Sequence, residues 1–143
     1  MKPENPDGIR GSQATGVAAR REKALKFDLQ AQSGGAVVLH CHGRIIFGPE
    51  ARALTSIVAD VLPTTGRMIV DLAGVEAVDS AGLGELVLLH MWSEAAGHSL
   101  KFAGPRPQVR SLLELTNLVS VFDTYADVAE ATAAMCGEQV CSA

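Results

Sequence analysis

The sequence predicts a single α/β domain built on a mixed sheet of about five strands with four helices. Short apolar runs typical of strands alternate along the chain with longer segments whose apolar residues have helical spacing. The length of 143 residues fits one domain, and a hydrophobic content of 48% is enough for a core without cross-links. The first two strands are close enough for an antiparallel hairpin, and right-handed crossovers would make the later strands parallel.

The domain is expected to span residues 23–136. Residues 1–22 hold several prolines and glycines among polar residues and show no hydrophobic period, so we expect a flexible N-terminal tail. Residues 137–143 are expected to form a similar C-terminal tail.

Two strands open the domain. The first is predicted at Leu25–Gln30, where apolar and polar residues alternate. A turn at Ser33–Gly35 leads to a second strand at Ala36–His42, and Gly43–Phe47 is interpreted as a short extension.

A helix and a buried strand follow. The helix begins at Gly48-Pro49-Glu50, because proline fits the first turn of a helix, and ends within Pro63–Gly66. Its buried side is predicted from five apolar residues at helical spacing, Ala51, Leu54, Val58, Val61 and Leu62. The apolar run at Arg67–Leu72 shows little alternation, which is typical of a strand covered on both faces.

The second helix is predicted directly after Asp79-Ser80, with Gly97 as its C-cap. Its buried side is expected to contain Leu83, Leu86, Val87 and Met91. A strand at Ser99–Ala103 follows.

The last elements are a third helix, a short strand and a fourth helix. The third helix is expected to bury Val109, Leu112, Leu113 and Leu115. It ends at Asn117, because asparagine tolerates the left-handed conformation that ends many helices. The strand is predicted at Val119–Phe122 and the Ala-rich helix at Asp127–Met135.

Charge and hydropathy exclude several functions. The net charge of -4 argues against nucleic acid, whose phosphates require a basic face. No apolar run approaches the roughly 20 residues of a membrane span, so we expect no membrane insertion. The first residues lack the apolar segment of a signal peptide, and a cytoplasmic protein is therefore expected.

Metal and cofactor sites are not predicted. The chain has three cysteines, an odd number, so free thiols are expected rather than a disulfide framework. Cys136 and Cys141 lack a second ligand pair. His40 and His42 would face the same side of a strand, but no third ligand is identifiable.

The most informative segment is Ile69–Leu86, which reads IVDLAGVEAVDSAGLGEL. Gly82 and Gly84 both fall in the early part of the predicted helix, where each glycine costs about 1 kcal/mol relative to alanine. Two reasons would explain them: close approach by another surface, or tight packing of the helix on the sheet.

Ser80 has more than one interpretation. As an N-cap it would accept a hydrogen bond from a helix N–H group, and spacing alone favours this role. An exposed serine at a helix start is also a suitable phosphate acceptor. An enzyme using Asp71, Asp79 and Ser80 is a weaker hypothesis, because Val78 occupies the first glycine of the nucleophile elbow G-x-S-x-G. We therefore expect a protein that is not an enzyme.

The segment VDLAGVEAVDSAGLGEL closely resembles the central signature of STAS domains, in particular of anti-sigma factor antagonists, in which D-S-[ST]-G-L-G begins a helix. Three other segments resemble the family's second strand, third helix and last strand and helix: AVVLHCHGRI, PRPQVRSLLELTNL and VFDTYADVAEA. The resemblance covers roughly residues 24 to 135.

This resemblance implies a partner-switching protein. Such proteins bind an anti-sigma factor, usually a serine kinase with a GHKL-type ATPase fold, until the kinase phosphorylates the serine after the motif's Asp. A phosphatase then restores binding. With the resemblance included, phosphorylation of Ser80 becomes the favoured interpretation. The expected partner-binding residues are Asp79, Ser80, Ala81, Gly82, Leu83, Gly84 and Arg44. The alternative is a STAS scaffold module of a transport or stress-signalling complex that is not phosphorylated.

Four positions depart from the family pattern. The family often has an acidic pair, as in G-E-L-D, where this chain has Gly43 followed by Arg44, Ile45 and Ile46. Ala81 replaces the usual second hydroxyl, and Asn117 replaces a glycine. The change at Arg44 and Ile46 bears on which partner is bound and is not expected to disturb the predicted fold.

Overall fold

A computed structural model describes residues 25–32 and 35–142. The predicted tail at residues 1–22 and two residues of the first predicted turn, Ser33 and Gly34, lie outside the described residues.

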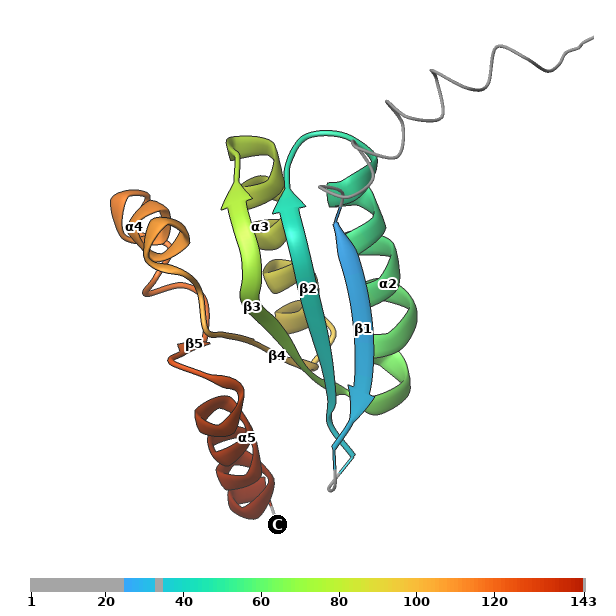
Figure 1. Cartoon of the computed structure of the whole chain (residues 1–143). Helices are drawn as coiled ribbons and strands as arrows, with labels where there is room; N and C mark the ends of the chain where they lie inside the picture. The colour runs from blue at the N-terminus through green and yellow to red at the C-terminus, as the bar shows by residue number, and fades with distance from the viewer. Residues whose placement is uncertain (1–24, 33–34, 143) are drawn as a thin grey trace, which may run out of the picture.

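The sheet has five strands in the order β1-β2-β3-β4-β5 (Figure 1). β1 and β2 are antiparallel and every later pair is parallel, which confirms the predicted mixed sheet. The strands are β1 (Lys26–Ala31), β2 (Val37–Ile45), β3 (Arg67–Val78), β4 (Ser99–Ala103) and β5 (Thr124–Tyr125).

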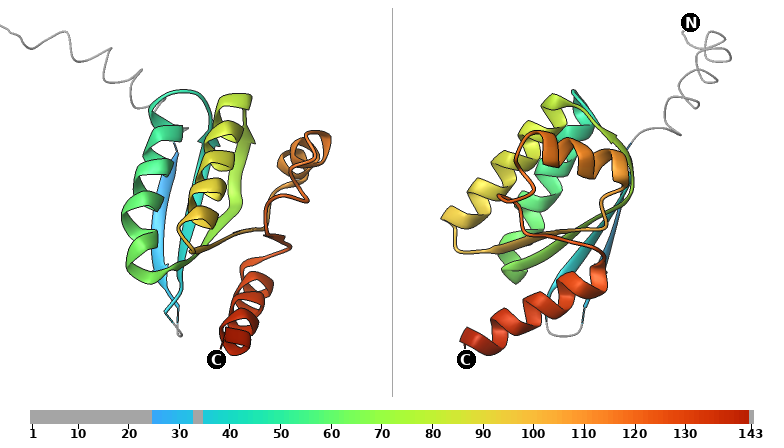
Figure 2. Two further views of the ribbon diagram at one scale, coloured as in Figure 1. Left: turned by 180° about the vertical axis from the view of Figure 1, so that it is seen from behind. Right: turned by 90° about the vertical axis from the view of Figure 1, so that its left-hand side faces the viewer.

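Four helices cover the sheet in the part of the chain that the structure describes: α2 (Pro49–Thr65), α3 (Ser80–Ala95), α4 (Pro107–Leu115) and α5 (Val128–Ser142). Buried side chains of α2, α3 and α4 share one apolar core, whereas those of α5 belong to another. The first three helices therefore lie on one face of the sheet and α5 lies on the other (Figure 2).

Alternate residues of the central strands point into the two cores. The larger core, beneath α2, α3 and α4, includes Leu39, Val70 and Phe102. The smaller core, beneath α5, includes Val38 and Ile69. The expectation that the strand beginning at Arg67 is covered on both faces is thus confirmed. Burial of each large apolar side chain contributes on the order of 1.5–3 kcal/mol to folding.

β3 is longer than predicted, because it continues from Leu72 to Val78. The reason is β2, which also extends to Ile45 and keeps pairing with β3 up to the register Ile45↔Val78. Gly74 permits this pairing, since a Cβ atom there would overlap Nδ1 of His42.

The predicted strand at Val119–Phe122 is wrong. These residues form turns, in which the Phe122 N–H donates to the Leu118 carbonyl at 2.9 Å, and the last strand is β5 instead. The apolar run reflects burial of Phe122 rather than strand pairing. Two predicted core residues are also exposed, Met91 by 59% and Leu115 by 85%.

The end of α2 lies within the predicted range, whereas the C-cap of α3 differs from the predicted one. α2 continues through Pro63 to Thr65, because a proline in the last turn removes only one helical hydrogen bond, and ends at Gly66 with φ of 73°. α3 has Ala96 as its C-cap, and Gly97 follows with φ of 77°.

The segment in which a C-terminal tail was predicted, residues 137–143, is included in α5 up to Ser142, so residues 137–142 continue the helix. The small and polar residues of this segment carry too weak a hydrophobic period to distinguish a helix from a tail.

Candidate functional site

The start of α3 is fixed to the end of β2 by Asp79, the N-cap residue. One carboxylate oxygen of Asp79, Oδ1, accepts a hydrogen bond from the Gly82 N–H at 2.8 Å, and the other, Oδ2, accepts one from the Phe47 N–H at 2.9 Å. The Asp79 N–H donates to the Ile45 carbonyl at 3.3 Å. Three hydrogen bonds of this one residue therefore join the strand, the following loop and the helix.

These contacts also determine the charge of the site. Hydrogen bonds from the N–H groups of Phe47 and Gly82 lower the pKa of Asp79, because they stabilise the ionised carboxylate. Asp79 is therefore a negative charge at neutral pH, at the positive end of the α3 dipole.

The two early glycines of α3 have different environments. A Cβ atom on Gly82 would overlap the Ile45 carbonyl oxygen and lie 2.8 Å from its carbonyl carbon, so the helix packs on β2 through bare backbone. A Cβ atom on Gly84 would meet nothing within 4 Å. Tight packing of the helix therefore explains Gly82, whereas Gly84 faces open space.

Ser80 is exposed and is the first residue of α3. The expectation that Ser80 is the N-cap is corrected, since the carboxylate of Asp79 performs that role. The helix start is thus satisfied without the serine hydroxyl.

The remaining expected partner-binding residues divide into two groups. Ala81, Gly82, Leu83 and Gly84 form the first turn of α3 with Ser80, where Leu83 is buried and Gly84 is exposed. Arg44 lies on β2, one residue before Ile45, which is buried in the core beneath α3. Because successive strand residues point to opposite faces, the side chain of Arg44 is directed away from α3. The Nε atom of Arg44 is buried without a hydrogen-bond partner in the part of the chain that the structure describes.

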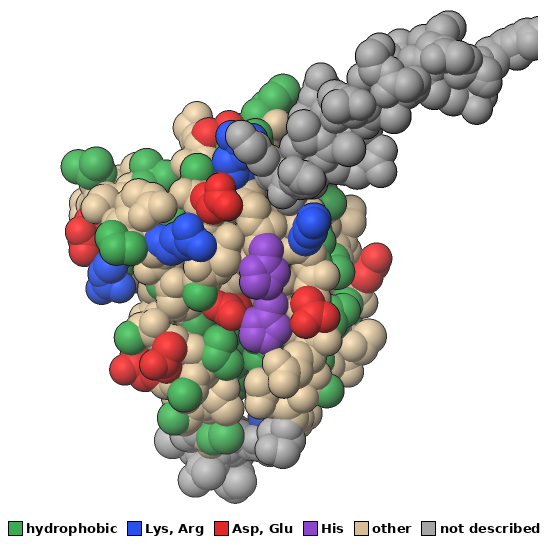
Figure 3. Space-filling model, viewed as in Figure 1, with side chains coloured by type: hydrophobic (Ala, Val, Ile, Leu, Met, Phe, Trp, Pro, Cys, Tyr) green, Lys and Arg blue, Asp and Glu red, His purple; other side chains and the backbone are tan. Residues whose placement is uncertain are grey.

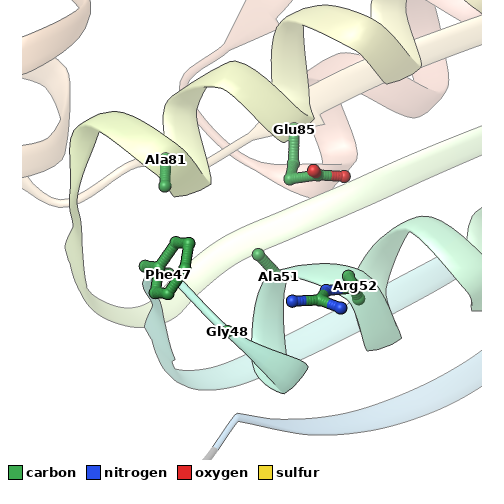
Figure 4. A pocket seen from close by; sticks show the side chains of 6 residues that line it. All are labelled: Phe47, Gly48, Ala51, Arg52, Ala81 and Glu85. Atoms are coloured by element: carbon green, nitrogen blue, oxygen red, sulfur yellow. The ribbon is translucent and has the colours of Figure 1, made fainter.

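An open pocket of about 190 Å³ adjoins the start of α3 (Figure 4). Phe47, in the loop before α2, and Ala81 form one end of the pocket, and Arg52 and Glu85 lie farther along it. Phe47 is 75% exposed. The sequence interpretation missed Phe47 and Arg52; an aromatic residue beside a predicted helix start was the available signal.

The acidic residues suggested for an enzyme are not brought together. Asp71 lies within β3, where Oδ2 contacts His40 Nδ1 at 2.7 Å, whereas Asp79 follows the end of the strand. The intervening extended residues separate the two carboxylates by more than about 20 Å.

His40 and His42 lie on the sheet face opposite α2 and α3. Figure 3 shows the histidines there with acidic side chains beside them, and the strand register places Asp28 and Asp71 on either side of His40. Within residues 25–32 and 35–142, no group of three or more His, Cys, Asp or Glu side chains is arranged to hold a metal ion.

In the described part of the chain, every helix is too short or too polar to cross a lipid bilayer.

The fold and the site together define an α/β module whose second helix presents a serine at its start. A family comparison identifies this module: the STAS domain model matches residues 28–131. The chain belongs to the STAS domain family.

Solved structures support the same fold. An anti-sigma factor antagonist from Mycobacterium paratuberculosis is 22% identical, with a TM-score of 0.67 and coverage of 78% of this chain and 94% of that one. The anti-sigma factor antagonist SpoIIAA in its unphosphorylated form is 18% identical, with a TM-score of 0.64 and coverage of 78% and 97%.

STAS folds also occur within transporters. The murine anion transporter Slc26a9 is 14% identical, with a TM-score of 0.65, and the match covers 87% of this chain but 24% of the transporter. A comparison with curated proteins found no match. At these identities the structural neighbours show the fold alone.

Proposed function

We propose that the chain is an anti-sigma factor antagonist, a regulatory binding protein controlled by phosphorylation of Ser80. In its unmodified form it binds an anti-sigma factor that is also a serine kinase, and phosphorylation releases it. The observation that carries this proposal is the exposed Ser80 at the first position of α3, with the capping role taken by Asp79. The hydroxyl can therefore be modified without loss of the cap.

The charge of the site explains how phosphorylation would act. A phosphate on Ser80 adds about 1.5 to 2 negative charges beside the ionised carboxylate of Asp79. The positive end of α3 favours a phosphate by about 0.3–1 kcal/mol, so the fold tolerates it. Desolvating an unpaired charge in an interface costs several kcal/mol, which is enough to dissociate a complex.

The proposed contact surface is the first turn of α3 with the loop before α2. It comprises Asp79, Ser80, Ala81, Gly84 and Phe47. The open space above Gly84 lets a partner's backbone approach closely, which a larger side chain would prevent. Gly82 and the buried Leu83 support this surface from below.

Arg44 was expected to be part of the same surface, but its side chain is directed to the other face of the sheet. We therefore propose that Arg44 contacts the partner only if the partner reaches around the end of β2. The replacement of an acidic pair by Arg44 and Ile46 indicates a partner whose charge differs from that of the usual kinase.

The test combines phosphorylation with binding. The purified chain would be incubated with ATP and each GHKL-type anti-sigma kinase of its source organism, and phosphate would be located by mass spectrometry. We expect one phosphate, on Ser80, absent from Ser80→Ala and retained in Ser56→Ala, a matched control because Ser56 is exposed on α2. Phosphate on the Ser80→Ala protein at the wild-type level would refute the assignment.

Binding separates this proposal from a second candidate. The second candidate is a STAS scaffold that is not phosphorylated. The fold is as similar to Slc26a9, with a TM-score of 0.65, as it is to the antagonist SpoIIAA, with a TM-score of 0.64. Under the first proposal Ser80→Asp weakens partner binding at least tenfold, whereas a scaffold would bind as before. Aspartate at the first helical position also suits the helix dipole, so the variant is expected to fold.

A further inference from the structure

The side of α3 that faces away from the sheet is mostly apolar, with Glu85 and the exposed Glu94 at its edges. Positions three or four residues apart share one side of a helix. The residues on this side are Ser80, Ala81, Gly84, Leu88, Met91, Trp92 and Ala95. Leu88 and Met91 are each 59% exposed and Trp92 is 36% exposed. Large exposed apolar side chains that adjoin one another on a helix indicate an interaction surface.

The outward side of α2 lies beside it (Figure 2). Its exposed residues include Arg52, Ala53, Ser56, Asp60 and Pro63. A pocket of about 260 Å³ lies between the two helices. It is lined by Thr55 and Ala59 of α2 and by Leu88 and Trp92 of α3, among others. The Thr55 hydroxyl donates a hydrogen bond to Glu85, which directs that carboxylate toward α2. We name these outward sides of α2 and α3 together the α2–α3 face.

We propose that the α2–α3 face binds the same face of a second copy of the chain, with the two α3 helices antiparallel. The residues of α3 are small near its start, at Ala81 and Gly84, and large toward its end, at Met91 and Trp92. An antiparallel pair centred on Leu88 places Gly84 of each copy opposite Trp92 of the other. The open space at Gly84 can accommodate that indole.

The charges of α2 complement each other in the same arrangement. A two-fold axis that reverses α3 also reverses α2 and keeps it on the same side of α3, so α2 of one copy faces α2 of the other. Arg52 lies level with the start of α3, because both line the first pocket, and Ala59 lies level with Trp92. Reversal therefore brings Arg52 of each copy near Asp60 of the other, so that opposite charges meet.

The size of the face distinguishes a permanent pair from a transient one. Each helix is about 25 Å long and about 10 Å wide, so two adjacent helices cover about 500 Å² in projection. Specific stable interfaces bury about 800 Å² on each partner. We therefore expect a reversible rather than a permanent dimer. The α2–α3 face shares Ser80, Ala81 and Gly84 with the contact surface proposed above, so the dimer and that partner would compete for it, but the dimer does not rest on the proposed function.

The test is the oligomeric state of the purified full chain in sedimentation velocity, from low micromolar to several hundred micromolar. The wild-type mass is expected to rise from one chain toward two. Leu88→Lys is expected to weaken association at least tenfold, whereas Leu115→Lys, a matched change at a residue 85% exposed on α4, is expected to behave as wild type. Trp92 is the single tryptophan, so its emission should shift to shorter wavelength as the wild type dimerises.

A charge exchange tests the antiparallel orientation. Arg52→Asp and Asp60→Arg should each weaken the dimer, and the double variant should restore it, because opposite charges meet again. Both residues are exposed, and circular dichroism would check that each variant folds. A wild type that remains monomeric throughout, or a Leu88→Lys variant that associates as wild type does, overturns the proposal. A double variant without recovery overturns the antiparallel orientation.

Discussion

Alanine substitution of the two early glycines of α3 should have opposite effects on stability. In a helix interior alanine is about 1 kcal/mol more favourable than glycine, so propensity alone predicts that both variants gain stability. The structure predicts this gain for Gly84→Ala only, because a Cβ atom there meets nothing within 4 Å.

The cost at Gly82 follows from its contact with β2. A Cβ atom would overlap the Ile45 carbonyl oxygen and lie 2.8 Å from the carbonyl carbon, and neither atom belongs to a flexible side chain. The backbone of β2 or of α3 must therefore shift, and such overpacking costs about 1–3 kcal/mol or more. The shift also disturbs the hydrogen bond between the Asp79 N–H and the Ile45 carbonyl. We expect Gly82→Ala to be about 2 kcal/mol less stable than wild type.

Urea unfolding followed by circular dichroism measures both variants under one condition. The predicted difference in unfolding free energy between Gly84→Ala and Gly82→Ala is about 3 kcal/mol, which exceeds the uncertainty of the extrapolation. If Gly82→Ala were as stable as Gly84→Ala, α3 would not be packed on β2 through bare backbone, and the geometry derived for the Ser80 site would be refuted.

Three further predictions concern acid stability, thiol reactivity and a helix end. Because the folded pKa of Asp79 is lowered, its contribution to stability is present above the unfolded pKa near 3.9 and is lost as pH falls through the folded value. The free energy of unfolding, measured as a function of pH, should fall less steeply in acid for Asp79→Asn than for wild type. The same fall in both proteins would contradict the lowered pKa of Asp79. Burial raises the pKa of the Cys41 thiol to about 12, so iodoacetamide at pH 8 should label the exposed Cys136 and leave Cys41 unlabelled until the protein unfolds; mass spectrometry distinguishes the two. Gly66→Ala should cost about 1 kcal/mol in thermal or urea unfolding, because Gly66 ends α2 with φ of 73°, and an unchanged stability would be inconsistent with that conformation.

Most of the sheet could be predicted because its signals are local. The alternation at Leu25–Gln30 reflects partial burial of Leu25 and Phe27, although Leu29 is 44% exposed. The apolar run after Arg67 reflects burial on two faces, and both strands are present. The extension of β3 to Val78 depends on pairing with β2, which a single segment does not encode. β5 is only two residues long, and the apolar run just before it belongs to a turn that buries Phe122.

In the candidate site, too, local features could be predicted, whereas contacts between distant segments could not. Asp79 and Ser80 at a helix start were evident from residue types, but which of them caps the helix depends on where the loop after β2 presents the Phe47 N–H. The contact of Gly82 with Ile45 joins residues far apart in the chain, so the sequence suggested a reason for glycine without identifying it. The exposure of Met91 could not be predicted either, because helical spacing assigned it to the buried side.

The division of roles at the start of α3 determines what kind of switch Ser80 can be. If Ser80 were the cap, its phosphorylation would alter the hydrogen bonds that begin the helix, and the signal would include a change of fold. Here Asp79 holds the helix start and Gly82 holds the helix against β2, so both constraints remain when Ser80 is modified. The phosphate proposed at this position would therefore change the charge of the surface without altering these two constraints, and a partner would detect it through the cost of desolvating that charge.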